Sequence, residues 1–229
     1  MLIGHIGAGI ACKKIDPQIN VSWLVLAALL PDMFLGVLTL IGIEGFIVPK
    51  DFLTGRYLLF TFPISHNLLA NVLVALLLFL GIWKFTKGEQ RIKRALAIAI
   101  AFQSHTLLDI IVHVKGLPLF GAGDWSVGLG LWEDVVFSML IELLLLLFGL
   151  ECYFRATKGE GIIANYAMIV VTYLLAAVAF YGQLQGPKPE NIYGPALSWI
   201  FLPLILFLLF HWLDTKRSPR IPTGEQASV

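Results

Sequence analysis

Six apolar segments, each about as long as a helix that crosses a bilayer, constrain this chain more than any other feature. A spanning helix needs about 20 apolar residues, and a backbone in lipid satisfies its hydrogen bonds only in helices or closed barrels. The sequence is 58% hydrophobic with a mean hydropathy of +0.84, too apolar for an ordinary soluble domain. We therefore predict an all-α, polytopic integral membrane helical bundle whose spans cover residues 21–43, 66–84, 94–114, 129–152, 162–182 and 195–213.

A shorter apolar helix is expected at residues 2–12, which are too few to cross the membrane. No internal repeat divides the chain, so we predict one membrane domain over residues 1–229. Within it, residues 1–128 carry the candidate site, 129–213 supply supporting helices and 214–229 form a polar tail. The formal charge of +1, without a basic face, gives no support to nucleic-acid binding.

The distribution of Lys and Arg predicts the orientation of the bundle. Residues 1–20, 84–94, 153–161 and 214–229 together hold twelve of these cations, whereas the loops on the other side hold four. Cytoplasmic loops carry the excess of positive charge in membrane proteins. We therefore predict that both termini are cytoplasmic.

The third apolar segment contains His105, Asp109 and His113 at positions i, i+4 and i+8. At about 100° per residue these side chains share one stripe of a helix, among Ile, Leu, Val and Ala neighbours. Ionisable groups in a membrane span are costly and need partners, so we interpret the stripe as functional. Imidazole nitrogens and a carboxylate together suit a bound divalent metal such as zinc.

Depth estimates bring other polar residues to a similar level. At a rise of about 1.5 Å per residue, Asp32 and His105 lie roughly 16 Å from the cytoplasmic face. On the same reckoning His5 is about 12 Å deep, and His66 is roughly 27 Å deep, nearer the outer face. Four of the five histidines and two acids therefore converge from four segments.

Two further ionisable residues lie in the apolar segments. Glu142 is deep among leucines and needs a partner that the sequence does not identify. His211, at the end of the last span beside Trp212, is interpreted as an interfacial residue without a chemical role.

Several short motifs in about the first 120 residues resemble one known family. They are Gly4-His5, ALLPD at 28–32, ISHN at 64–67, and SHTLLD at 104–109 followed by GLPLF. In order and spacing they are similar to those of the YdjM-like, LexA-regulated inner-membrane metal-dependent hydrolases. The resemblance implies a location in the inner membrane and a metal-dependent hydrolytic activity.

The resemblance also implies metal-ligand positions, namely His5, Asp32, His66, His105 and Asp109. The chain departs from the family pattern at three positions. Phe34 and Leu35 stand where the family has Asp and His, and Thr61 stands where it has a first His. His113 is a candidate to replace part of that lost ligand supply.

The helical spacing suggests how such a site would be arranged. His105 and His113 are about 12 Å apart along the helix axis, too far to share one metal comfortably. Asp109 lies between them and can bridge two metals held about 3.5–4 Å apart, an arrangement that supports displacement at phosphorus. With one metal, three of the ligands would hold it, and Asp32 or Asp109 would be free to act as a general base. We therefore expect one or two divalent ions, with zinc preferred and manganese as the alternative.

We expect the substrate to be a lipid or lipid-linked phosphoester whose tail stays in the outer half of the bilayer. Arg56 and Lys115 on the outer loops are candidate phosphate contacts, although interfacial cations that only snorkel toward water are an equal alternative. Two other classes stay open, namely a non-catalytic membrane subunit and an ion or proton transporter that uses the same His/Asp cluster. The sequence has no zincin, α/β-hydrolase or nucleotide-binding motif.

The charge asymmetry makes a topological prediction. Residues 84–94 should be cytoplasmic and residues 115–128 external. With Glu89→Cys and Phe120→Cys variants, an impermeant thiol reagent added to intact cells should label position 120 and not position 89. Labelling of position 89 alone would mean that the bundle is inverted.

Overall fold

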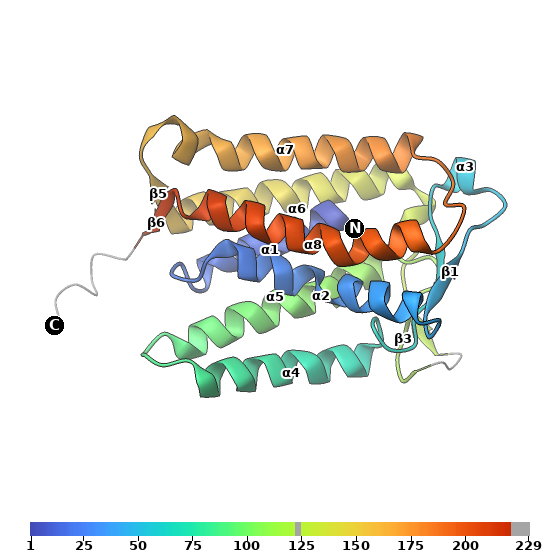
Figure 1. Ribbon diagram of the computed structural model, residues 1–229, viewed down its shortest axis with the longest axis horizontal. Helices are drawn as coiled ribbons and strands as arrows, with labels where there is room; N and C mark the ends of the chain where they lie inside the picture. Colours follow the sequence, from blue (N-terminus) through green and yellow to red (C-terminus); the bar gives the residue numbers. More distant parts are fainter. Residues whose placement is uncertain (122–124, 221–229) are drawn as a thin grey trace.

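The structure, a computed structural model, describes residues 1–121 and 125–220 and is a bundle of long helices (Figure 1). Within these residues, six helices are long and apolar enough to cross a membrane, and they fit a multi-pass membrane protein. The predicted all-α bundle with a short first helix is therefore confirmed. Its helices are α1 (Leu2–Ala11), η1 (Cys12–Lys14), α2 (Val21–Leu40), α3 (Phe52–Gly55), α4 (Leu68–Phe85), α5 (Arg91–Val112), η2 (Leu131–Glu133), α6 (Val135–Ala156), α7 (Gly161–Gln185) and α8 (Tyr193–Asp214).

Four of the predicted spans are too long at their outer ends: the span predicted over 21–43 ends at Leu40, the span predicted over 129–152 starts at Val135, and the other two involve candidate ligands. The span predicted over 66–84 starts at Leu68, because the side chain of Asn67 accepts the backbone N–H of Ala70 and caps the helix. The span predicted over 94–114 ends at Val112, and His113 is already extended. His66 and His113 therefore lie on irregular backbone beside the helices, where they are still buried.

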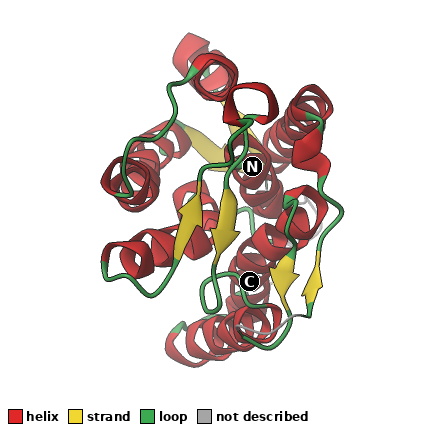
Figure 2. Ribbon diagram, turned by 90° about the vertical axis from the view of Figure 1, so that its right-hand side faces the viewer, coloured by secondary structure: helices red, strands yellow, loops and turns green. Residues whose placement is uncertain are grey.

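Short antiparallel strand pairs cross the two ends of the bundle. At one end, β1 (Gly45–Ile47) pairs with β2 (Leu59–Thr61), and β3 (Leu117–Pro118) pairs with β4 (Ser126–Val127). Figure 2 looks onto this end. The loop between α7 and α8 lies at the same end (Figure 1). At the opposite end, β5 (Thr157–Gly159) pairs with β6 (Arg217–Pro219).

The short helix α1 lies inside the bundle, between α2 and α6. Its Ile3, Ile6 and Ile10 are at most 1% exposed, as expected for a helix that is apolar all round. Its glycines allow a backbone-to-backbone approach on two sides. A Cβ on Gly149 of α6 would collide with the backbone oxygen of Gly7, and a Cβ on Gly9 would lie 2.9 Å from the backbone oxygen of Leu24. The position of α1 therefore depends on residues that have no side chain.

A buried ion pair joins three segments at the end of the bundle that carries η1. Lys13 donates to Asp214 at 2.7 Å and to the carbonyl of Ile19 at 2.6 Å, and the same Asp214 oxygen accepts the N–H of Val21. Of the predicted tail over 214–229, Asp214 is the buried last residue of α8, and the chain then forms β6. Positions 221–229 of that tail lie outside the described residues.

Replacing Gly149 tests the close approach of α1 and α6. Gly149→Ala should lower the thermal stability of the purified protein, because overpacking costs about 1–3 kcal/mol and the collision is with backbone. Gly81→Ala is the matched control, since Gly81 lies in α4 with nothing within 4 Å of an added Cβ. That control should be neutral or stabilising, because Ala favours helix over Gly by up to about 1 kcal/mol. Equal melting temperatures for the two variants would contradict this packing.

Candidate metal centre

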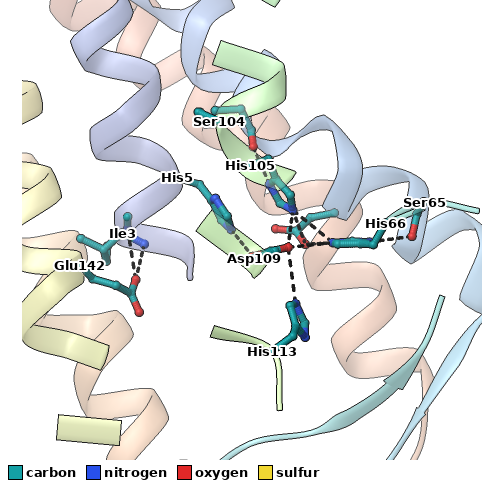
Figure 3. A network of polar contacts seen from close by, with 12 residues as sticks. Ile3, His5, Ser65, His66, Ser104, His105, Asp109, His113 and Glu142 are labelled. Atoms are coloured by element: carbon teal, nitrogen blue, oxygen red, sulfur yellow. Dashed lines mark hydrogen bonds and ion pairs between the residues drawn. The ribbon is translucent and has the colours of Figure 1, made fainter. Parts of the chain in front are cut away.

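The six predicted metal ligands come together in one buried cluster, shown in part in Figure 3. Five of the side chains are almost completely enclosed, with residue exposures between 0% and 6%. They come from α1, α2, the turn before α4, and α5 with the residue that follows it. The cluster consists of His5, Asp32, His66, His105, Asp109 and His113.

Asp109 is at the centre of the cluster and faces four imidazoles. Its Oδ2 atom lies 3.0 Å from Nε2 of His105, 3.2 Å from Nε2 of His66 and 3.4 Å from Nε2 of His113. Its Oδ1 atom lies 3.1 Å from Nε2 of His5. The carboxylate is therefore in contact with His5 on α1, His66 before α4, His105 on α5 and His113, which directly follows α5.

The spacing of these atoms matches that of ligands around one ion. Ligands about 2.0–2.2 Å from a tetrahedral metal are separated by roughly 3.3–3.6 Å, and the distances around Asp109 Oδ2 are close to this range. Three overlapping groups of three residues each bring one ligand atom from every member within 4.8 Å of the others. In the described residues none of these groups contains both His105 and His113, in agreement with the axial spacing along α5. The groups are His5/His105/Asp109, Asp32/His66/His105 and His66/Asp109/His113.

Hydrogen bonding determines which nitrogen of His105 can bind a cation. Its Nδ1 lies 2.7 Å from the carbonyl oxygen of Ala28, which only accepts, so Nδ1 carries the proton. In the neutral ring the Nε2 lone pair then points at Asp109 and at Nε2 of His66, which is 3.1 Å away. Acceptor atoms gathered so closely repel one another unless a cation or a proton lies among them.

Unpaired buried atoms also favour a cation. Among the described residues, His5 Nδ1 and Asp109 Oδ1 have no hydrogen-bond partner, although Oδ1 is within 3.1 Å of His5 Nε2. The His5 Nε2 and Asp109 Oδ1 atoms are thus close together but not aligned for a hydrogen bond, as expected for two atoms that both point at a cation between them. An unpaired buried carboxylate oxygen is costly, so the donor set and its geometry are compatible with a divalent metal.

Local features of the helices explain how the ligands are positioned. Pro31 interrupts the hydrogen-bond ladder of α2 one residue before Asp32, and the Ala28 carbonyl in the preceding turn accepts from His105. On α1, the N–H groups of Ile3 and Gly4 donate to the carboxylate of Glu142 (Figure 3). This contact is the partner of Glu142 that the sequence did not identify, and it anchors the helix start next to His5.

A cavity of about 400 Å³ adjoins the cluster. Asp32 is the most accessible ligand that lines it, with 25% of its side chain exposed against 2% for Asp109. Arg56, a predicted phosphate contact, also lines the cavity and donates to the carbonyl of Gly186. Lys115, the other predicted contact, is exposed and lies outside the cavity lining. His211 is exposed on α8, away from the cluster, as expected for an interfacial residue.

Two buried residues beside the cluster escaped the sequence analysis. Glu44 is 6% exposed and Ser65 is 3% exposed, and the Ser65 hydroxyl lies 2.8 Å from Nδ1 of His66. Glu44 lies in a segment between apolar runs, where an acid is normally solvated. The position of Ser65 directly before His66 could have indicated this contact from the sequence, because a Ser hydroxyl can donate to or accept from an imidazole nitrogen.

Comparison with known proteins leaves the site to be judged on its geometry. No protein-family model matches the chain, and neither does any curated protein or solved structure.

The geometry predicts that the protein purifies with one or two divalent ions per chain and that Asp109→Asn removes them. The substitution keeps the size of the side chain but removes the charge that faces four imidazoles. Even changes outside the ligands cost about 10–100-fold in metal affinity, and loss of the central carboxylate should cost at least about that much. Elemental analysis of detergent-purified protein and thermal stability with added divalent ions measure the effect.

His211→Ala is the matched control, because it removes an imidazole that is outside the cluster. It should leave the metal content unchanged. Wild-type metal content in purified Asp109→Asn would show that the cluster does not hold the ion in the way described.

Proposed function

We propose that this protein is a membrane-embedded, metal-dependent hydrolase that cleaves a phosphoester of a lipid or lipid-linked substrate. The observation that carries the proposal is the junction of a buried His/Asp cluster with a partly apolar cavity that also contains an arginine. The resemblance of the motifs around His5, Asp32, His66 and His105 to the YdjM-like hydrolases agrees with it. We further propose zinc, with manganese as the alternative, because imidazole and carboxylate ligands suit both ions.

The lining of the cavity supports an amphipathic substrate. Apolar residues of α7 and α8 line it, among them Phe180, Leu202 and Pro203, and these helices are largely exposed to the surroundings of the bundle. A lipid tail can remain against this apolar wall while its head group reaches the cluster. The cavity lies at the end of the bundle that carries α3 and β1, which the charge asymmetry assigns to the outer half of the membrane.

Arg56 is suited to bind the phosphate of such a head group. Its guanidinium donates to the carbonyl of Gly186 through Nη1, and that bond fixes the side chain at the cavity. A guanidinium presents five donors in a planar fork, so its other N–H groups stay available for phosphate oxygens. We therefore propose Arg56 as the phosphate contact and leave Lys115 out of this role.

The two acids at the cluster take different roles in this proposal. Asp109 is enclosed by imidazoles and acts as a ligand, together with His66, His105 and either His5 or His113. A divalent ion held by these residues would supply Lewis-acid chemistry, polarising a phosphoryl oxygen and making water more acidic. Asp32 faces the cavity and accepts the proton of the attacking water on its carboxylate.

Phosphate release from phosphatidic acid and from a polyprenyl diphosphate in detergent tests the proposal. The metal-loaded protein should hydrolyse at least one of these lipids much faster than a soluble phosphate ester. Asp32→Asn should retain metal and lose at least about 100-fold in kcat, because general-base catalysis contributes typically 10²–10⁴-fold. A protein that binds metal but releases no phosphate from either lipid would favour the non-catalytic subunit. Metal-dependent proton or ion flux in vesicles would favour the transporter.

Arg56→Gln separates binding from chemistry in the same assay. It should raise KM about tenfold or more and leave metal content unchanged, because a hydrogen bond to a charged group is worth about 1.5–3 kcal/mol. Lys188→Ala is the control, since Lys188 is an exposed cation in the loop after α7 and does not line the cavity. An equal KM for the two variants would remove Arg56 from the site.

A further inference from the structure

Glu44 is buried close to the cluster without belonging to it. It follows α2, where the N–H groups of Ile43 and Glu44 both donate to the carbonyl of Leu38 and turn the chain back. This turn directs the Glu44 side chain at the segment before α4, and only 6% of the residue is exposed. Burying a carboxylate in an apolar bundle costs free energy, so a functional role is the default interpretation of Glu44.

The contacts of Glu44 go to the residues directly before His66. Its Oε1 accepts the backbone N–H groups of Ile64, at 2.7 Å, and Ser65, at 2.8 Å. Its Oε2 contacts the hydroxyl of Ser65 at 2.5 Å. Asn71 holds the same residue from the other side by donating to the Ser65 carbonyl. The Ser65 backbone is therefore fixed, and its hydroxyl hydrogen remains the one part that can rotate.

The direction of these hydrogen bonds determines the tautomer of His66. With Glu44 as a carboxylate, which only accepts, the single hydroxyl hydrogen of Ser65 points to Oε2. The Ser65 oxygen can then only accept from His66 Nδ1, at 2.8 Å, so Nδ1 carries the proton. The lone pair of Nε2 is left facing Asp109 Oδ2, at 3.2 Å, and His105 (Figure 3).

We propose that Glu44 is a positioning residue that acts through Ser65 to hold the proton of His66 on Nδ1 and the lone pair of Nε2 toward the cluster. It touches neither Asp109 nor any other ligand among the described contacts. The carbonyl of Ala28 does the same for His105. Histidines that bind metals usually donate their other N–H to a carboxylate or a carbonyl in this way. The importance of Glu44 for metal binding rests on the proposed function, whereas the tautomer of His66 does not.

Glu44→Gln reverses the chain of hydrogen bonds with a minimal change in shape. The two backbone N–H groups of Ile64 and Ser65 require the amide oxygen of Gln, so its NH₂ group is directed at the Ser65 hydroxyl. Ser65 then accepts from Gln and donates to Nδ1 of His66, which moves the ring proton to Nε2. The lone pair no longer faces the cluster, although the fold keeps its backbone contacts.

The tautomer is measured by ¹⁵N NMR of histidine-labelled, metal-free protein, with the His66 signals assigned by their loss in His66→Gln. The wild type should show the Nδ1–H form and Glu44→Gln the Nε2–H form. The zinc dissociation constant should rise about 10–100-fold in Glu44→Gln, as is typical for residues that orient a ligand. Glu133→Gln, an exposed acid at the same end of the bundle, is the control and should change neither quantity.

Ser65 provides an independent pair of variants that leaves Glu44 in place. Ser65→Ala removes the hydroxyl and should weaken zinc binding, whereas Ser65→Thr keeps it and should restore binding. This pair decides the question if Glu44→Gln does not fold. An unchanged His66 tautomer in Glu44→Gln, or equal zinc affinity in Ser65→Ala and Ser65→Thr, would overturn the role of Glu44. A wild type that binds no zinc, manganese or other divalent ion would overturn the proposed function, and the NMR result would still decide the tautomer.

Discussion

The buried carboxylate of Asp109 is the feature on which the arrangement of this bundle depends. A charge with 2% exposure inside apolar helices is strongly unfavourable unless it is compensated. Four imidazoles, from α1, the turn before α4, and α5 with the residue that follows it, lie within 3.0–3.4 Å of the carboxylate oxygens, and a cation or a proton held among these atoms compensates the charge. Helix α1 and the turn before α4 must therefore approach α5 closely to bring His5 and His66 to Asp109.

One of the close backbone approaches in the structure brings a ligand to Asp109. Helix α1 reaches the interior because Gly7 and Gly149 allow backbone contact, and its start is anchored by Glu142. His5 lies within two residues of both of these contacts. Hydrogen bonds and close packing outside the cluster therefore help to position His5.

Much of this site could be predicted from the sequence, and the limits have a physical cause. The helical repeat places His105 and Asp109 on one stripe, and the depth of Asp32 in its span follows from counting residues. The roles of Glu142 and Glu44 could not be predicted, because their partners are mainly backbone N–H groups, which every residue but proline possesses. Backbone N–H groups produce no sequence motif. Which of them a buried carboxylate contacts depends on how α1 and the loop after α2 pack against segments that are distant in the sequence.

The histidines on the two sides of the Asp109 carboxylate differ in how their Nδ1 atoms are hydrogen-bonded. On the Oδ2 side, His105 has its Nδ1 fixed by a carbonyl and His66 has its Nδ1 against the Ser65 hydroxyl. On the Oδ1 side, the Nδ1 of His5 has no partner among the described residues, and the ring is oriented by stacking on His105 at a centroid distance of 3.8 Å. A ligand whose lone pair is already directed loses less freedom on binding an ion. Under the proposed function the Oδ2 side is therefore the better prepared of the two, because no hydrogen bond fixes the ring proton of His5 on Nδ1.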